Sequence, residues 1–376
     1  MVLLEYKTRA KTAKDDPEQT DVVMTFDTDR AIEVFTHAVR AYRVRSHIFA
    51  LDDLFPEATK PDFIEDKSSK HVMWHFLGVF FDHTKESKDL YRDLYFMIQD
   101  YPKLLSVDGI LGQGINSLEK KLRTRLAHPD SRRESGFLLD AMTHVKDIFG
   151  SDIKDILKGT TDLNVVRERL LRVKNISDKK ANLFLLYMIK YKIKQFKNPN
   201  DLEMAVDFHK VRASYALGIV DFNVPSLTGQ VARRLVRVAY TDFLKQNPDL
   251  PFNMIDLDDI LWVVPSKVCS KSVRSPAEKS QKWLRCLRYC PFFAKYCVKP
   301  VVRNDYKGYF DFTSSIRSPD FVNLGTNKDL LLYPLSRQEV MLWPKHIRSV
   351  RYYEDTPLER HVYNNADNPQ SSMFEE

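Results

Sequence analysis

Apolar residues recur at helical spacing through most of this 376-residue chain, and this periodicity constrains the fold more than any other feature. In the first such segment, Ala31, Val34, Phe35 and Ala38 fall on one side of a helix. Similar segments follow near 69–83, 87–100, 115–127, 135–149, 151–158, 162–172, 178–197 and 226–246. Alternating, strand-like segments are scarce before residue 300, so the sequence predicts a mainly α-helical fold.

The composition is that of a globular protein, with 43% hydrophobic and 29% charged residues. Only 11 glycines are present, which argues against glycine-rich repeats. Lys and Arg number 58 against 51 Asp and Glu, and the formal net charge is +7. This modest excess permits nucleic-acid binding without requiring it, because the distribution of the charge matters more than its sum.

No apolar run reaches the roughly 18 residues that a membrane span needs. The first 21 residues lack a long apolar core before a cleavage site, so no secretory signal is expected. We therefore expect a cytoplasmic or nucleoid-associated protein that is not secreted. In a reducing compartment, its four cysteines are thiols or metal ligands rather than disulfides.

A tight corner between two helices is predicted within residues 170–181. Asn175 suits a left-handed turn, and Ser177 or Asp178 suits the cap of the following helix. Lys179 and Lys180 then lie on the first turn of that helix. Backbone N–H groups at such a helix start favour a phosphate, although an ordinary helix–turn–helix corner fits the same residues.

A second motif spans residues 206–212, where Asp207 follows an Ala-Val pair and precedes His209 by two positions. Asp207 is predicted to cap a helix that begins near Phe208, with His209 orienting it. A capping role does not exclude a chemical one, because capping fixes the carboxylate in place.

Together the two motifs resemble the helix-hairpin-helix DNA glycosylase superfamily, which includes endonuclease III and the 8-oxoguanine DNA glycosylases. The family hairpin reads roughly Leu-Pro-Gly-Val-Gly-x-Lys-x-Ala and is matched by residues 173–181. The family's Val-Asp-x-His-Val-x-Arg is matched by residues 206–212, with one residue inserted before Val211. Asn175 and Ser177 replace the hairpin glycines, and Lys174 replaces the proline. A serine with positive φ at this place would carry strain.

The resemblance covers about residues 135–240 and implies a two-lobed helical fold that binds double-stranded DNA as a monomer. It implies extrusion of a damaged or modified base and cleavage of its N-glycosidic bond, with an associated AP-lyase activity. By position, Asp207 matches the essential aspartate and Lys179 the Schiff-base lysine. The predicted DNA contacts within these motifs are Asn175, Ser177, Lys180, His209 and Arg212.

All four cysteines fall within 29 residues, at positions Cys269, Cys286, Cys290 and Cys297. Four thiolates can bind a [4Fe–4S] cluster or a structural zinc ion. The wide first gap and the Cys290-Pro291 pair resemble the cluster loop of endonuclease III, although every gap is longer here. The resemblance favours the iron–sulfur cluster; zinc and unligated cysteines are the alternatives.

The segment from Lys267 to Asp305 holds ten basic residues against two acidic ones, with aromatic residues interleaved. This one-sided charge predicts a phosphate-binding loop, to which we assign Lys282, Arg285 and Arg288. A solvated basic face over a local aromatic core is the alternative.

We expect six parts in the chain. They are a polar lead-in at 1–25, an N-terminal helical region at 26–134, a helix-hairpin-helix catalytic core at 135–265, a basic cysteine-rich cluster loop at 266–305, an irregular C-terminal extension at 306–362 and a disordered tail at 363–376. Two further functions compete with DNA repair. One is non-catalytic DNA binding on the same scaffold, and the other is excision of a hypermodified, phage-type base in defence.

Overall fold

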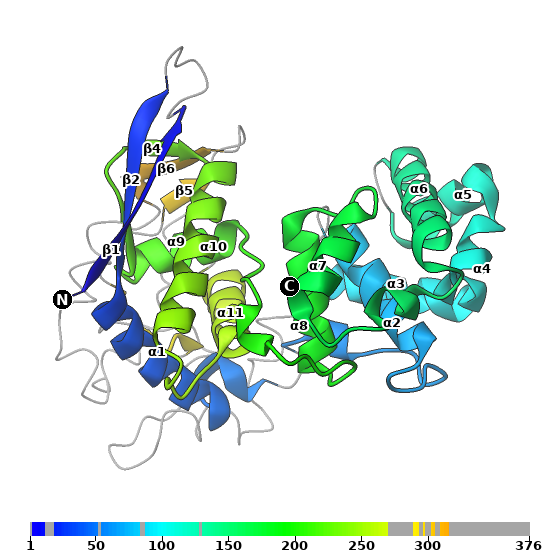
Figure 1. The fold of residues 1–376 in the computed structure, drawn as a ribbon, viewed down its shortest axis with the longest axis horizontal. Helices are drawn as coiled ribbons and strands as arrows, with labels where there is room; N and C mark the ends of the chain where they lie inside the picture. The colour runs from blue at the N-terminus through cyan, green and yellow to red at the C-terminus, as the bar shows by residue number, and fades with distance from the viewer. Residues whose placement is uncertain are drawn as a thin grey trace, which may run out of the picture. The chain divides into compact units, whose positions relative to one another are not determined.

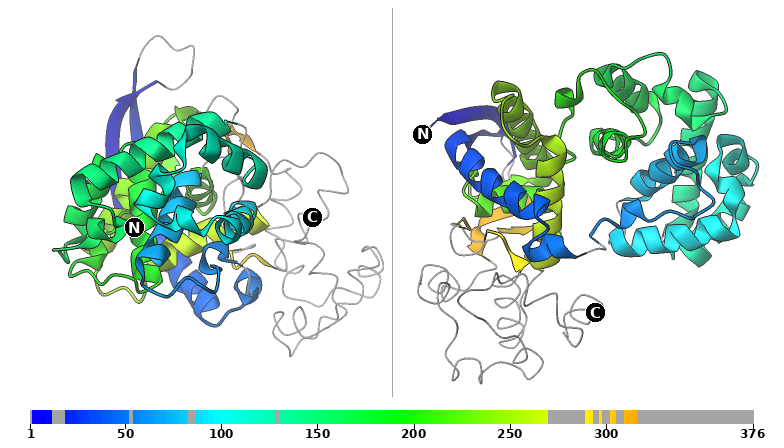
Figure 2. Two further views of the ribbon diagram at one scale, coloured as in Figure 1. Left: turned by 90° about the vertical axis from the view of Figure 1, so that its right-hand side faces the viewer. Right: turned by 90° about the horizontal axis from the view of Figure 1, so that it is seen from below.

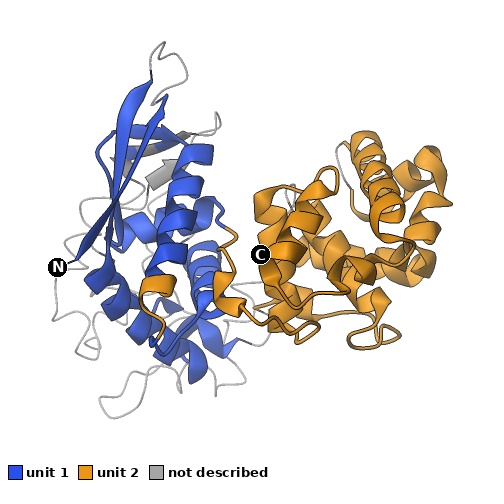
Figure 3. Cartoon of the chain, viewed as in Figure 1, with its two compact units in different colours: residues 1–52, 206–243, 249–376 blue, residues 53–205, 244–248 orange. Residues whose placement is uncertain are grey.

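The computed structural model describes residues 2–11, 19–51, 54–82, 87–127, 130–269, 289–292, 296–297, 302–304 and 309–315. Over these residues the fold is mainly α-helical, as the sequence predicts (Figure 1). The chain divides into two compact units (Figure 3). Unit 1 contains residues 1–52, 206–243 and 249–376, and unit 2 contains residues 53–205 and 244–248.

Two small antiparallel sheets belong to unit 1. In the first, the order is β1 (Leu3–Ala10), β2 (Thr20–Asp27) and β3 (Val220–Phe222). In the second, β6 (Tyr309–Ser315) lies between β4 (Ser226–Thr228) and β5 (Val302–Asn304). Phe26 pairs with Val220, so the first sheet joins strands from distant parts of the sequence.

The helices of unit 1 are α1 (Thr28–Arg43), α9 (Phe208–Ala216), α10 (Gly229–Gln246) and α11 (Met254–Val263), followed by a π-helical turn, Val264–Val268. Their core is aromatic. The ring of Tyr240 lies 5.2 Å from that of Phe26 and 5.8 Å from that of Phe35, which joins α10 to β2 and α1. Helix α11 packs against both α1 and α9, which fixes α9 inside the unit.

Unit 2 is built from helices alone among its described residues. They are α2 (Ser69–Phe81), α3 (Ser87–Asp100), α4 (Val107–Leu111), α5 (Gly114–Arg125), α6 (Ser131–Phe149), α7 (Leu163–Arg172) and α8 (Asp178–Lys190), with short 3-10 turns between some of them. Helix α2 is buried along nearly its whole length and packs against α3 and α8. Helices α5 and α6 lie side by side (Figure 2).

The predicted helices are confirmed with small changes at their ends, except that the segment predicted at 151–158 forms only a 3-10 helix, Ile153–Leu157. The first 25 residues differ from the polar lead-in that the sequence predicts. Residues 3–10 and 20–27 form a β-hairpin instead. Its first strand alternates between exposed and less exposed side chains, so charged residues face out on every second position. The long helix expected over 178–197 ends at Lys190, and Lys192 adopts a positive φ of 54°.

The unit boundaries also differ from the predicted parts. The expected catalytic core at 135–265 is shared between the two units, because the chain passes from unit 2 to unit 1 at residues 205 and 206. Most of the predicted extension at 306–362, and all of the predicted tail at 363–376, lie outside the described residues; residues 309–315 form β6. In the described part of the chain, no helix is both long enough and apolar enough to cross a membrane.

Candidate functional site

The hairpin between α7 and α8 is an exposed turn with one left-handed residue. Asn175 has a φ of 65°, as the sequence predicts, and asparagine tolerates this conformation better than most residues. Its side-chain amide donates to the carbonyl of Phe137 at 3.2 Å, which ties the turn to α6. Val173, at the end of α7, is buried and anchors the other side of the turn.

Ser177 caps α8 from an extended conformation with φ −89° and ψ 168°. Its hydroxyl accepts from the backbone N–H of Lys180 at 3.4 Å. The replacement of a family glycine by serine therefore carries no positive-φ strain at this position. Ser177 and Asp178 are exposed, so the start of α8 is open to an anionic ligand.

The two neighbouring lysines on α8 have different surroundings. Lys179 Nζ lies 2.9 Å from a carboxylate oxygen of Asp82, the C-cap residue of α2. Lys180 Nζ lies 4.4 Å from the centre of the Phe80 ring. Burial lowers the pKa of the Lys180 ammonium, and Lys179 acts in the same direction while Glu134 opposes it. Lys179 thus has a carboxylate partner for its charge, and burial disfavours the charged form of Lys180.

Asp207 is the N-cap of α9, as predicted. Its Oδ1 accepts from the backbone N–H of Lys210 at 3.0 Å, which fixes the carboxylate at the helix start. His209 is half-buried on the same turn, and its ring centre lies 3.9 Å from that of Phe208. Lys179 belongs to unit 2 and Asp207 to unit 1.

Arg212, predicted as a DNA contact, is only 5% exposed. A side chain buried to this degree is poorly placed for a direct contact with a phosphate. Its Nε and Nη2 atoms have no hydrogen-bond partner among the described residues. Burial lowers the pKa of this guanidinium, while Cys269 and Asp207 oppose the shift. Arg212 thus links these two residues electrostatically inside unit 1.

Three of the four cysteines are described. Cys290 is buried, whereas Cys269 and Cys297 are partly exposed. Helix α1 holds the segment that contains two of them, because Arg30 donates to the carbonyl of Tyr296 at 2.8 Å and His37 Nε2 lies 3.0 Å from the carbonyl of Pro291.

No group of three or more His, Cys, Asp or Glu side chains in the described part of the chain is placed to hold a metal ion. The fourth cysteine and the three basic residues assigned to the loop lie outside the described residues; they are Cys286, Lys282, Arg285 and Arg288.

Two partners of the motif residues were not anticipated from the sequence. Asp82 pairs with Lys179 from the end of a helix about a hundred positions earlier in the sequence, and no local sequence pattern predicts that contact. Lys210 is 2% exposed and pairs with Asp258. The lysine next to the apolar Val211 in this helix was a usable signal, because a lysine on a buried face needs a buried partner.

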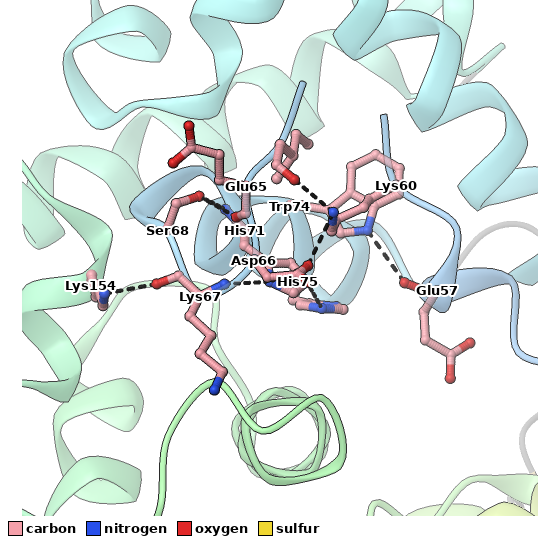
Figure 4. Close-up of polar contacts among 11 residues, drawn as sticks. Glu57, Lys60, Glu65, Asp66, Lys67, Ser68, His71, Trp74, His75 and Lys154 are labelled. Atoms are coloured by element: carbon pink, nitrogen blue, oxygen red, sulfur yellow. Dashed lines mark hydrogen bonds and ion pairs between the residues drawn. The ribbon is translucent and has the colours of Figure 1, made fainter. Parts of the chain in front are cut away.

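Unit 2 also contains a buried pair of histidines on successive turns of α2 (Figure 4). His71 Nδ1 accepts from the backbone N–H of Lys67 at 3.0 Å, so the proton of a neutral His71 lies on Nε2. That nitrogen lies 3.1 Å from His75 Nε2, which must accept. His75 therefore carries its proton on Nδ1, an atom with no partner among the described residues. Both rings must be neutral for this arrangement to hold.

We expect the stability of unit 2 to fall as the pH falls below about 6.5. Burial lowers the pKa of His71 below its ordinary value of 6.5 and that of His75 well below it. The unfolded chain then binds more protons than the folded one, so this stability is fully present above pH 6.5 and is lost below it.

Urea unfolding at pH 7.5 and 5.5 measures the difference. His75→Phe keeps a ring against Tyr191, on which His75 stacks at 4.8 Å, and should reduce the pH dependence. His144→Gln, a change at a surface hydrogen bond of α6, should leave it unaltered. An unchanged pH dependence in His75→Phe would contradict this account.

Comparisons with known proteins leave the family open. No family model matches the sequence, and no curated protein matches it. Among solved structures, one match is described as the structure of a thermostable thymine-DNA glycosylase. It has a TM-score of 0.43 and 11% identity, and the match covers 72% of this chain and 96% of that chain. At this TM-score and identity, the similarity does not identify the fold.

Proposed function

We propose that the protein is a DNA glycosylase that acts as a monomer on double-stranded DNA containing a modified base. One observation carries the proposal. The exposed turn at 173–177 has Asn175 in the left-handed conformation and leads into the capped start of α8, and Asp207 follows in the chain as the N-cap of α9. The start of α8 suits a DNA phosphate, and the Asp207 carboxylate suits the positive charge that develops on the sugar.

The chemistry assigned to Asp207 is electrostatic. Cleavage of an N-glycosidic bond builds positive charge on the sugar, and an ionised carboxylate close to C1′ stabilises that charge. The hydrogen bond from Lys210 N–H fixes one carboxylate oxygen of Asp207. The target base must first leave the helical stack, because C1′ is not accessible in an intact duplex.

An AP-lyase step is part of the same proposal, with Lys179 as the attacking amine. At rest the carboxylate of Asp82 stabilises the charged form of this lysine at 2.9 Å. Attack requires the neutral amine, so the proton must pass to an acceptor, and Asp82 is a carboxylate within hydrogen-bonding distance.

We also propose that Cys269, Cys286, Cys290 and Cys297 bind a [4Fe–4S] cluster, with zinc as the alternative. Support comes from Arg212, whose buried Nε and Nη2 have no partner among the described residues and on which Cys269 acts electrostatically. An anionic metal–thiolate group accepts such hydrogen bonds. When bound, the group would cross-link the cysteine segment and fix the basic loop.

Metal analysis tests this assignment. We expect stoichiometric iron and sulfide in protein purified without oxygen, and Cys290→Ser should reduce both. Stoichiometric zinc without iron would favour the alternative. Metal-free protein with full activity would contradict both assignments.

The function itself is tested with a panel of duplexes that each carry one modified base, followed by alkali to cleave abasic sites. We expect strand breaks at one class of lesion, which form at least ~100-fold more slowly with Asp207→Asn protein. Binding without base release from any duplex would favour a non-catalytic DNA-binding protein. Release confined to a hypermodified phage base would favour a role in defence.

A further inference from the structure

A buried ion pair lies directly beside the Asp207 turn. Lys210 Nζ is 2.6 Å from Asp258 Oδ1, and the two residues are 2% and 4% exposed. Lysine and aspartate are rarely buried to this degree, because removing either charge from water is costly unless a partner compensates. This pair joins α9 to α11 within unit 1.

The same lysine is bonded to Asp207 through its backbone. Its N–H donates to Asp207 Oδ1 at 3.0 Å, and its carbonyl accepts from the hydroxyl of Ser214 at 2.8 Å. Ser214 in turn shares a 2.8 Å hydrogen bond with the hydroxyl of Tyr240 on α10. The turn that presents Asp207 is therefore held by α11 through a side chain and by α10 through a hydroxyl chain.

The charges around this turn are mostly negative. Burial raises the pKa of Asp258, and the carboxylates of Asp259 and Asp207 act in the same direction, while Lys210 opposes them. Asp259 also accepts from the hydroxyl of Tyr42 on α1 at 2.8 Å. Removing the Lys210 ammonium would leave less positive charge to offset the repulsion among the carboxylates of Asp258, Asp259 and Asp207.

Other titratable groups of unit 1 belong to the same surroundings. On α9 itself these are His209 and the buried Arg212, and beyond the π-helical turn Cys269 acts on Arg212. Asp221 on β3 acts on Tyr215 near the C-terminal end of α9. Helix α10 contributes the hydroxyl of Tyr240, which is bonded to Ser214.

We propose that Lys210 is a positioning residue for Asp207: its ammonium favours the ionised Asp207 carboxylate, and its pairing with Asp258 keeps the Asp207 turn in place. This inference rests on the function proposed above. The Lys210 ammonium and the Asp258 carboxylate, which are nearly equally buried, act on Asp207 with opposite signs. Removing the ammonium therefore disfavours the ionised form of Asp207, and removing the carboxylate favours it.

The test compares the pH dependence of base release in the full-length protein and three variants. Lys210→Met should move the acid limb of the profile to higher pH and slow base release at pH 6 by at least ~10-fold, with DNA affinity little changed. Asp258→Asn should move the limb to lower pH. The double variant Lys210→Met/Asp258→Asn should return the limb close to its original position, because both charges are gone.

The opposite movements separate this role from a structural one. A residue needed only for packing would slow base release in both single variants without moving the limb in opposite directions, and that result would overturn the proposal. If Lys210→Met does not fold, Asp258→Asn and the double variant still decide the question, since limbs that coincide in the two would show that Lys210 exerts no charge effect.

A second measurement is independent of catalysis. A ¹³C titration of the Asp207 carboxyl, identified by its loss in Asp207→Asn, should show the same opposite movements. If the unaltered protein releases no base from any duplex, the proposed function fails, and this titration still tests Lys210. A titration unmoved by either substitution would refute the role of the ion pair.

Discussion

Asp207→Asn is expected to slow base release at least ~100-fold, a loss of about 3 kcal/mol in transition-state stabilisation. Asparagine keeps a side-chain oxygen that can accept from Lys210 N–H, so the cap of α9 is preserved while the charge is removed. Single-turnover base release on the duplex identified in the panel measures the effect. DNA affinity should not weaken, because losing a negative charge does not reduce attraction to phosphates.

Asp221→Asn is the matched control. It removes the same charge from an exposed position of β3 in the same unit, and it should leave base release unchanged. Full activity in Asp207→Asn would end the mechanism proposed here. Equal losses in the two variants would point to a general charge effect.

Lys179→Gln is expected to abolish covalent trapping by borohydride. In the trapped reaction, the amine attacks the C1′ aldehyde carbon of the abasic sugar and loses water to form an imine. Borohydride then reduces the imine to a stable secondary amine. Glutamine has no such nucleophile, so the adduct seen with the unaltered protein on a denaturing gel should disappear.

Lys180→Gln is the control for this experiment, because it changes the neighbouring amine and leaves the Lys179–Asp82 pair intact. An adduct that persists in Lys179→Gln and is lost in Lys180→Gln would assign the chemistry to Lys180. No adduct with the unaltered protein, despite base release, would leave Lys179 as a phosphate contact. In that case Lys179→Gln should weaken DNA binding with a smaller salt slope.

Local features of this fold were predictable from the sequence. Helical periodicity located α2, α6 and α10, and side-chain capping preferences located the turn at Asn175 and the caps at Ser177 and Asp207. These features depend on residues within one or two helical turns, which a sequence pattern records directly.

Long-range features were not predictable in the same way. The partner of Lys179 on α2 and the partner of Lys210 on α11 are set by packing between distant helices. The hairpin β1–β2 was hidden because its exposed positions carry charges such as Glu5, Lys7 and Arg9, which also suit a polar lead-in. The division into units was hidden because the chain crosses between them at Ala205 and Val206, without a glycine-rich or proline-rich linker.

The placement of nearly all of unit 2 between two parts of unit 1 fixes an order of events during synthesis. The helices α2 to α8 are complete once residue 205 has left the ribosome, and they can fold at that point. The hairpin β1–β2 is translated before unit 2 but gains its third strand only when Val220 is available to pair with Phe26. The aromatic contacts of Phe26 on β2 form later still, because they need Tyr240 and Phe243 to have left the ribosome. Residues that are translated before unit 2 are therefore among the last to reach their native contacts.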